Sequence, residues 1–156
     1  MAAAQHLLVT IRADTMRQNG VIMAKLHVIQ LTKGQSILPA IHEYLMDKKW
    51  NDCVIINGVG SVTDVCLSNP GSYEMPPELV KKKIFDPCEV VSCMGEITLK
   101  EHTAPDLPAV IKETPSPYVV HIHMSVSHSE GIVNGGGFRS ATVLRALTLY
   151  VLELDN

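Results

Sequence analysis

Residues Pro117 to Phe138 read Pro-Tyr-Val-Val-His-Ile-His-Met-Ser-Val-Ser-His-Ser-Glu-Gly-Ile-Val-Asn-Gly-Gly-Gly-Phe, and this stretch decides the expected fold. Strand side chains alternate between two faces, so residues 118–127 place apolar side chains on one face and mostly polar ones on the other. His121 and His123 therefore stand side by side on the polar face. A turn at Ser129–Gly131 and a short return segment complete a predicted hairpin, which three glycines follow.

The composition is that of one ordered domain. The chain has 156 residues, of which 46% are apolar and 19% charged. Its net charge of −3 argues against a surface that binds nucleic acid unaided, which would need a basic patch. The compact basic run Lys81–Lys83 is expected to be a solvated loop.

The cysteines and the chain start predict an intracellular protein, either cytoplasmic or nuclear. No two cysteines have C-x-x-C spacing, and all four are expected to be reduced thiols in or near the core: Cys53, Cys66, Cys88 and Cys93. The first residues lack the features of a signal peptide. No apolar run reaches the roughly 18–20 residues of a membrane span.

One main helix is predicted among strands. Apolar residues recur at helical spacing from Ile37 to Leu45, with an N-cap near Ser36 and Pro39 in the first turn. Strands are predicted at 6–12, 23–31, 52–56, 62–67, 89–94, 96–100 and 118–127, the first two forming a hairpin. The apolar residues of 141–154 fit neither the helical nor the strand repeat cleanly. A long strand is favoured over a helix because most of the chain before them is strand.

Glycine and proline divide the predicted strands. Gly58 and Gly60 predict a bend or bulge, and Gly95 a second one. Residues 68–87 and 102–117 are predicted to be long proline-containing loops, with one helical turn around 77–80. Loops of this length in compact domains often make interfaces.

Four segments in order resemble the PPC family (Plants and Prokaryotes Conserved domain). They are Leu31–Leu38 (LTKGQSIL), Gly58–Asp64 (GVGSVTD), Cys88–Ile97 (CEVVSCMGEI) and His121–Ser125 (HIHMS), followed by Gly131, Val133 and Gly135–Gly136. The resemblance implies an α+β fold, with a mostly antiparallel sheet packed on one main helix, assembled as a homotrimer. It covers a PPC-like domain at 25–154, with 1–24 as an N-terminal strand extension.

The resemblance also divides the functional question. Plant members of the family carry a separate basic AT-hook, built around Arg-Gly-Arg-Pro, that contacts DNA. This chain contains no Arg-Gly-Arg-Pro, so direct DNA binding is not expected. Some stand-alone members of the family look like metal-binding proteins, with a site made from His-x-His and a later histidine. The fold is also similar to that of the zinc enzyme acetolactate decarboxylase.

His121 and His123 are thus candidate metal ligands, with zinc as the metal. Firm binding needs at least three protein ligands. The family's third histidine corresponds here to Gly137. His128 is expected to point away, whereas His102 or a neighbouring subunit could supply a third ligand. The alternative is that the pair is structural and hydrogen-bonded to backbone or across a trimer interface.

Glycines and carboxylates supply the remaining candidates. A ligand could approach the bare backbone of the glycine segments, so the candidate ligand-binding residues are Gly58, Gly60, Ser61, Gly135, Gly136 and Gly137. The alternative is that these glycines only turn corners. Glu96, Glu101 and Asp64 are general-base candidates by residue type alone, and no catalytic residue is predicted.

Two functions remain open from sequence. In the first, the chain is a homotrimeric assembly or regulatory module, non-enzymatic, that binds itself and other proteins and is linked to transcription regulation through those partners. In the second, it binds a metal or small molecule through the His-x-His strand, and could be a metal-dependent enzyme. No membrane partner is expected.

Overall fold

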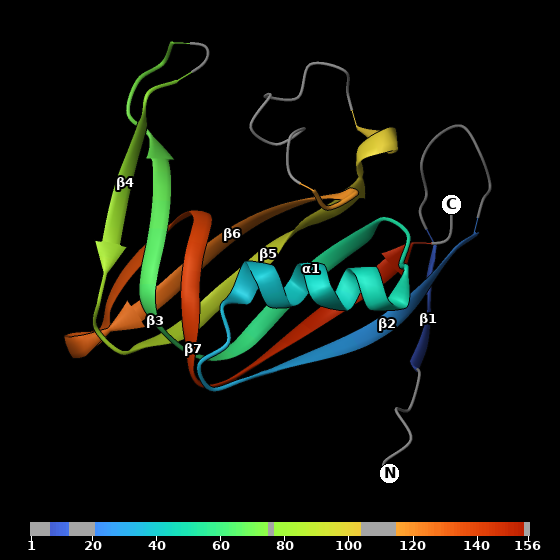
Figure 1. Ribbon diagram of the computed structural model, residues 1–156, viewed down its shortest axis with the longest axis horizontal. Helices are drawn as coiled ribbons and strands as arrows, with labels where there is room; N and C mark the ends of the chain where they lie inside the picture. The colour runs from blue at the N-terminus through green and yellow to red at the C-terminus, as the bar shows by residue number, and fades with distance from the viewer. Residues whose placement is uncertain (1–6, 13–20, 75–76, 104–114, 155–156) are drawn as a thin grey trace.

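The computed structural model describes residues 7–12, 21–74, 77–103 and 115–154, with side chains described from Ala24 onward. These residues form one antiparallel sheet and one α-helix, α1 (Ile37–Lys48), which confirms the α+β class (Figure 1). The strands are β1 (Leu7–Arg12), β2 (Val21–Thr32), β3 (Cys53–Pro70), β4 (Leu79–Ile84), β5 (Cys88–Leu99), β6 (Tyr118–His128) and β7 (Ile132–Leu154). Two short 3-10 turns are η1 (Lys100–His102) and η2 (Ser129–Gly131).

The sheet curls because its longest strand, β7, pairs with three others. The strand order is β1-β2-β7-β6-β5-β3-β4, with an additional pairing between β7 and β3. Residues 132–137 of β7 pair with β6, and most of the remainder pairs with β3. Residues 146–154 also pair with β2 on the other side. Strands β7, β6, β5 and β3 therefore form a closed circuit.

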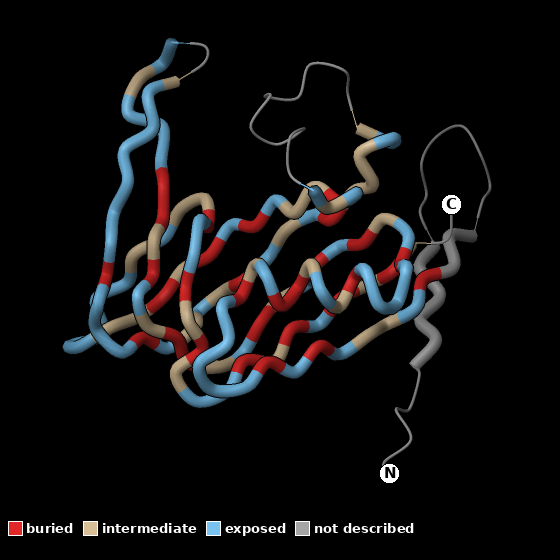
Figure 2. The backbone as a smooth tube through the Cα atoms, in the orientation of Figure 1, coloured by how far each residue is buried: buried red, intermediate tan, exposed pale blue. Residues whose placement is uncertain are grey.

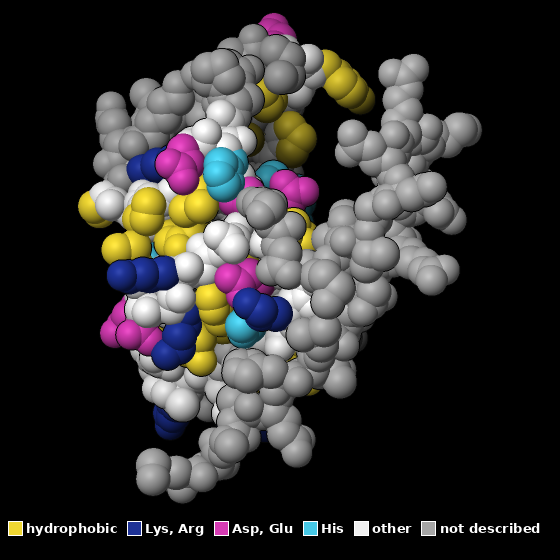
Figure 3. Space-filling model, turned by 90° about the vertical axis from the view of Figure 1, so that its right-hand side faces the viewer, with side chains coloured by type: hydrophobic (Ala, Val, Ile, Leu, Met, Phe, Trp, Pro, Cys, Tyr) yellow, Lys and Arg dark blue, Asp and Glu magenta, His cyan; other side chains and the backbone are white. Residues whose placement is uncertain are grey.

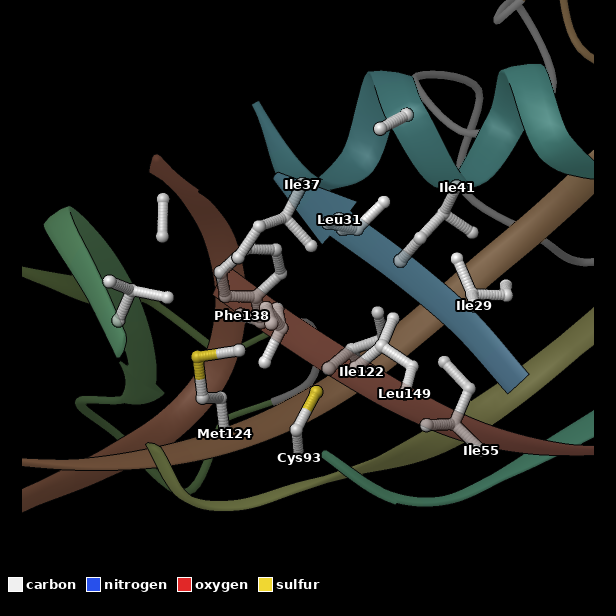
Figure 4. Close-up of a cluster of buried hydrophobic side chains, with 14 of the residues drawn as sticks. Ile29, Leu31, Ile37, Ile41, Ile55, Cys93, Ile122, Met124, Phe138 and Leu149 are labelled. Atoms are coloured by element: carbon white, nitrogen blue, oxygen red, sulfur yellow. The ribbon is translucent and has the colours of Figure 1, made fainter. Parts of the chain in front are cut away.

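Helix α1 covers the inner face of this curved sheet. Its buried residues are Ile37, Ala40, Ile41 and Leu45. Figure 4 shows Ile37 and Ile41 above Ile29 and Leu31 of β2 and the sheet residues beneath them. Burying each such aliphatic side chain stabilises the fold by about 1.5–3 kcal/mol. Buried and exposed positions alternate along most strands, as strand geometry requires (Figure 2).

A buried polar cluster joins the end of α1 to the sheet. The Tyr118 hydroxyl donates to the Trp50 carbonyl at 2.7 Å, and the Trp50 ring stacks on His27 with centroids 4.1 Å apart. His27 Nε2 lies 2.8 Å from the carboxylate of buried Glu153, whose other oxygen accepts from the Asn51 amide at 3.2 Å. Four separate segments are thereby held together.

The predicted strand breaks at Gly58–Gly60 and at Gly95 are wrong, because β3 and β5 run through them. Strand β3 is irregular there, with register shifts between Ile55 and Asn57 and between Gly60 and Val62. Of the bend and the bulge predicted for Gly58–Gly60, the bulge therefore agrees better with the structure. A Cβ on Gly95 would lie 2.1 Å from the His121 carbonyl, so this glycine allows close approach of β6 within a continuous strand.

The prediction of a loop over 68–87 is also wrong. Strand β3 continues to Pro70, and β4 pairs with it to form a projecting hairpin at one sheet edge (Figure 1). The helical turn predicted around 77–80 is replaced by the start of β4, and Lys81–Lys83 lie within that strand. Of the second predicted loop, residues 104–114 lie outside the described residues.

Other strand predictions are confirmed. Strand β1 pairs with β2 as the predicted N-terminal hairpin. Residues 141–154 are extended throughout as part of β7. The turn at Ser129–Gly131 is present as η2. The three glycines that follow lie within β7 and do not interrupt that strand.

Candidate functional site

His121 and His123 lie beside each other on the outer, solvent-facing side of β6. Their Nε2 atoms are 3.1 Å apart and their ring centroids 5.0 Å apart. In the sheet register, His121 lies opposite Glu96 of β5, and His123 lies between Met94 of β5 and Gly137 of β7. The predicted pairing of the two imidazoles on one face is therefore present.

A third metal ligand is not found within the described part of one chain. Gly137 lies opposite His123 but has no side chain to offer. His102 is not grouped with the pair, and its Nδ1 lies 2.9 Å from the Asp52 carboxylate. His128 is engaged with Asn134 at 2.9 Å. Among the described residues, no group of three or more histidine, cysteine or acidic side chains could hold a metal ion.

The two imidazoles nevertheless suit a shared metal. Two ligands of a tetrahedral zinc ion, each about 2.0–2.1 Å from the metal, lie about 3.3 Å apart. The 3.1 Å between the two Nε2 atoms is close to that separation. A metal shared by the pair would take two ligands from the described part of the chain, and the same 3.1 Å contact is also that of a hydrogen bond between the two imidazoles.

Exposed apolar side chains lie on β2, β3, β5 and β7, on the same side of the sheet as the histidine pair and opposite α1. They are Val28, Val54, Ile56, Val59, Met94 and Tyr150. The register makes two pairs on this face direct neighbours: Val28 pairs with Tyr150, and Met94 pairs with His123. We call these six residues and the two histidines the outer sheet face.

The candidate ligand-binding glycines lie against other strands of the same chain. A Cβ on Gly60 would lie 2.1 Å from the Ala146 carbonyl, and one on Gly136 would lie 2.7 Å from the Asn69 amide oxygen. Neighbouring strands also approach the other glycines, with Leu149 at Gly58, Ser125 at Gly135 and Ser68 at Gly137. Ser61 is buried, and its hydroxyl accepts from Arg145 Nε at 3.1 Å. A ligand-binding role for this set stays a prediction.

The three candidate general bases are dispersed. Glu96 is exposed and lies opposite His121. The Glu101 carboxylate is 3.9 Å from His102 Nε2 on η1. Asp64 lies in β3 with a left-handed φ of 53° and lines a cavity at the start of α1. Only Glu96 is near the histidine pair.

A second group of polar side chains, which was not predicted, comes together elsewhere. Lys33, His128 and Arg145 line a cavity of about 550 Å³. They come from three separate elements, and no spacing in the sequence relates them. His128 was considered only as a metal ligand, and its place in this cavity depends on the fold.

The described surface mixes charge and hydrophobicity. On the end of the molecule seen in Figure 3, positive, negative and hydrophobic side chains are interspersed among the described residues. In the described part of the chain, no helix combines the length and the apolar composition needed to cross a membrane.

Comparisons with solved structures support the fold. A metal-containing protein of Archaeoglobus fulgidus has 25% identity and a TM-score of 0.66, over 84% of this chain and 80% of that one. A plant- and prokaryote-conserved protein of Pyrococcus horikoshii has 18% identity and a TM-score of 0.67, over 100% and 86%. A candidate DNA-binding protein of Bacteroides thetaiotaomicron has 15% identity and a TM-score of 0.60, over 94% and 83%.

Family membership rests on a direct match over most of the chain. No protein among the curated sequences is significantly similar to this one. The model of the Plants and Prokaryotes Conserved domain matches residues 20–155, which include every strand from β2 to β7 and α1. The chain therefore belongs to the Plants and Prokaryotes Conserved (PCC) domain family.

Proposed function

We propose that this chain is a non-enzymatic assembly module that associates with copies of itself through the outer sheet face. The expected assembly is a homotrimer, and the number three rests on the resemblance to the family. In this proposal the 25–154 domain carries the contact surface, with 1–24 as an added edge strand. Other proteins bind the assembled form, and a link to transcription regulation runs through them.

The observation that carries the proposal is the exposure of six large apolar side chains on the sheet face that also carries the histidine pair. Contiguous apolar surface of this kind on a folded chain typically marks a protein interface. Tyrosine and methionine, both present on this face, are enriched at such interfaces, and acidic side chains are depleted. Glu96 is paired with both Val54 and His121, so it lies within this face, and its carboxylate would need a polar partner in the contact.

Two methionines allow a matched test of self-association. Met94 on the outer sheet face is 53% exposed, and Met46 on the solvent side of α1 is 52% exposed. Met94→Lys should dissociate the assembly, because it buries a charge in an apolar contact. Met46→Lys should leave it intact. Light scattering after size-exclusion chromatography measures both, and a wild-type monomer at micromolar concentration would overturn the proposal.

Direct DNA binding is not part of this function. Successive strand residues point to opposite faces, so Lys82 of β4 is separated from Lys81 and Lys83. The lysine run therefore does not form one continuous basic surface. Lys82 is also engaged with the Asn134 side chain.

A second candidate function is metal binding by the histidine pair. The spacing of the two Nε2 atoms favours it, as does the metal content of the Archaeoglobus fulgidus relative. Because the pair lies on the proposed contact face, another copy is the natural source of a third ligand. Zinc would then link copies of the chain, and the protein would be a metal-stabilised assembly.

Elemental analysis of the purified, untagged protein tests the metal hypothesis. Bound zinc that disappears in a His121→Ala/His123→Ala variant would establish the site. A His102→Ala variant is the control, because that imidazole pairs with Asp52. Wild-type protein that stays metal-free after incubation with excess zinc would exclude the metal hypothesis and leave the self-association proposal standing.

A further inference from the structure

A cavity on another part of the molecule brings together basic side chains from distant segments. It has a volume of about 550 Å³ and lies where the turn before α1 meets the start of β5, the end of β6 and the middle of β7. Cavities of a few hundred cubic ångströms suit small-molecule ligands. Lys33, His128 and Arg145 contribute its nitrogen donors, and Glu89 its one carboxylate.

Arg145 is held in a defined orientation. Its Nε donates to the Ser61 hydroxyl at 3.1 Å, and one terminal nitrogen donates to the Glu89 carboxylate. A guanidinium has five N–H groups in a planar arrangement, so these two contacts leave others for a ligand. Such a fixed guanidinium suits bidentate binding of phosphate.

His128 lines the same cavity and carries a buried, unpaired ring nitrogen. Lys82 donates to the Asn134 carbonyl oxygen, which leaves the Asn134 amide nitrogen to donate to His128 Nε2 at 2.9 Å. The imidazole therefore carries its proton on Nδ1. That atom is buried and has no hydrogen-bond partner among the described residues. A buried donor without an acceptor is destabilising, and a rotation of the ring that turns Nδ1 toward the cavity would exchange the Asn134 contact for one to an anionic oxygen.

The charges around the cavity favour an anion. Lys33 and Arg145 are positive, and Glu89 partly compensates them. His128 adds a hydrogen-bond donor and no negative charge. The cavity is thus locally positive in a chain whose net charge is −3.

We propose that this cavity binds a small molecule that carries a phosphate group. Arg145 makes the principal contacts to the phosphate oxygens, Lys33 adds charge, and His128 donates from Nδ1. The volume exceeds that of a phosphate ion, so the remainder of the ligand occupies the rest of the cavity. This site is separate from the histidine pair and does not depend on self-association.

Titration of the full chain with inorganic phosphate tests the proposal, at constant ionic strength maintained with chloride. We expect saturable changes in the backbone amide NMR signals of Gly34, Ser127 and Arg145. Arg145→Gln should weaken phosphate binding about tenfold or more, because it removes charge-assisted hydrogen bonds. Lys33→Gln gives a second test that leaves the Ser61 and Glu89 contacts untouched.

Arg139→Gln is the matched control. Arg139 lies on the same strand, is exposed, and likewise donates from Nε to a serine hydroxyl, that of Ser68 at 2.7 Å. The control should bind phosphate like the wild type. Signal changes that are unsaturable in the millimolar range, or equal losses in the Arg139 and Arg145 variants, would overturn the proposal. Saturation by sulfate with the same affinity would still support an oxyanion site, whereas saturation by chloride alone would refute it.

Discussion

Burial controls the chemistry of the cysteine residues. Burial raises the pKa of the Cys93 thiol to about 12. Burial, helped by the nearby Glu153 and Asp52 carboxylates, raises the pKa of Cys53 to about 12 as well. All four cysteines are free thiols, as predicted from their spacing, and only Cys66 is partly exposed.

Thiol reactivity should therefore be confined to one residue in the folded protein. Because the thiolate is the reactive form and burial raises the pKa of Cys53 and Cys93 to about 12, both thiols should react slowly at pH 8. We expect one fast-reacting thiol per chain with Ellman's reagent, and none in Cys66→Ser. More than one fast thiol in the native wild type would contradict this, and denaturant should release all four.

His42 should make stability depend on pH. Burial, with a smaller effect of the Lys100 charge, lowers its pKa below the usual 6.5. The unfolded chain therefore takes up this proton at a higher pH than the folded chain. The contribution to stability is complete above pH 6.5 and is lost as pH falls from there through the lowered folded-state pKa.

Urea denaturation at several pH values measures this effect. The free energy of unfolding of the wild type should fall below pH 6.5 more steeply than that of His42→Gln. Glutamine keeps a polar partner for the Ser116 hydroxyl, which lies 2.8 Å from His42 Nδ1. Parallel curves for the two proteins would show that His42 does not contribute.

At the scale of the element, Gly95 determines how closely β5 and β6 approach. A Cβ there would lie 2.1 Å from the His121 carbonyl, and a backbone atom cannot move aside as a side chain can. We expect Gly95→Ala to reduce the free energy of unfolding by about 1–3 kcal/mol, as overpacking does. The same substitution should disturb the histidine pair, because the carbonyl belongs to His121.

Gly135→Ala is the comparison for this measurement. A Cβ at Gly135 would lie 3.4 Å from the Ser125 Cβ, an ordinary contact. Its free energy of unfolding in urea should stay close to that of the wild type. Equal stability of the two alanine variants would refute the role assigned to Gly95.

The spacing of apolar residues predicted those helices and strands whose sequence pattern is regular. The helix from Ile37 and the strand at 118–127 were predicted because their apolar spacing is regular over many residues. Strand β4 was missed, because its sequence Leu-Val-Lys-Lys-Lys-Ile alternates poorly and follows several prolines. Its pairing with β3 supplies backbone hydrogen bonds that the sequence pattern does not show.

At the scale of the whole molecule, self-association should couple to stability. If the outer sheet face is buried between copies, the melting temperature should rise with protein concentration. Met94→Lys should abolish that dependence, and Met46→Lys should retain it. Calorimetry over a hundredfold concentration range makes the comparison, and a concentration-independent wild type would argue against an assembly.

The sequence by itself determined the fold class, the family and the neighbouring positions of His121 and His123. These follow from periodicity and from motifs read over short distances, in which side-chain direction depends only on the local backbone. Tertiary structure alone decided that His102 pairs with Asp52, that Gly60 and Gly95 lie inside continuous strands, and that Lys33, His128 and Arg145 share a cavity. Those arrangements depend on which strands pair and how the sheet curls, and contacts between residues far apart in the chain determine both.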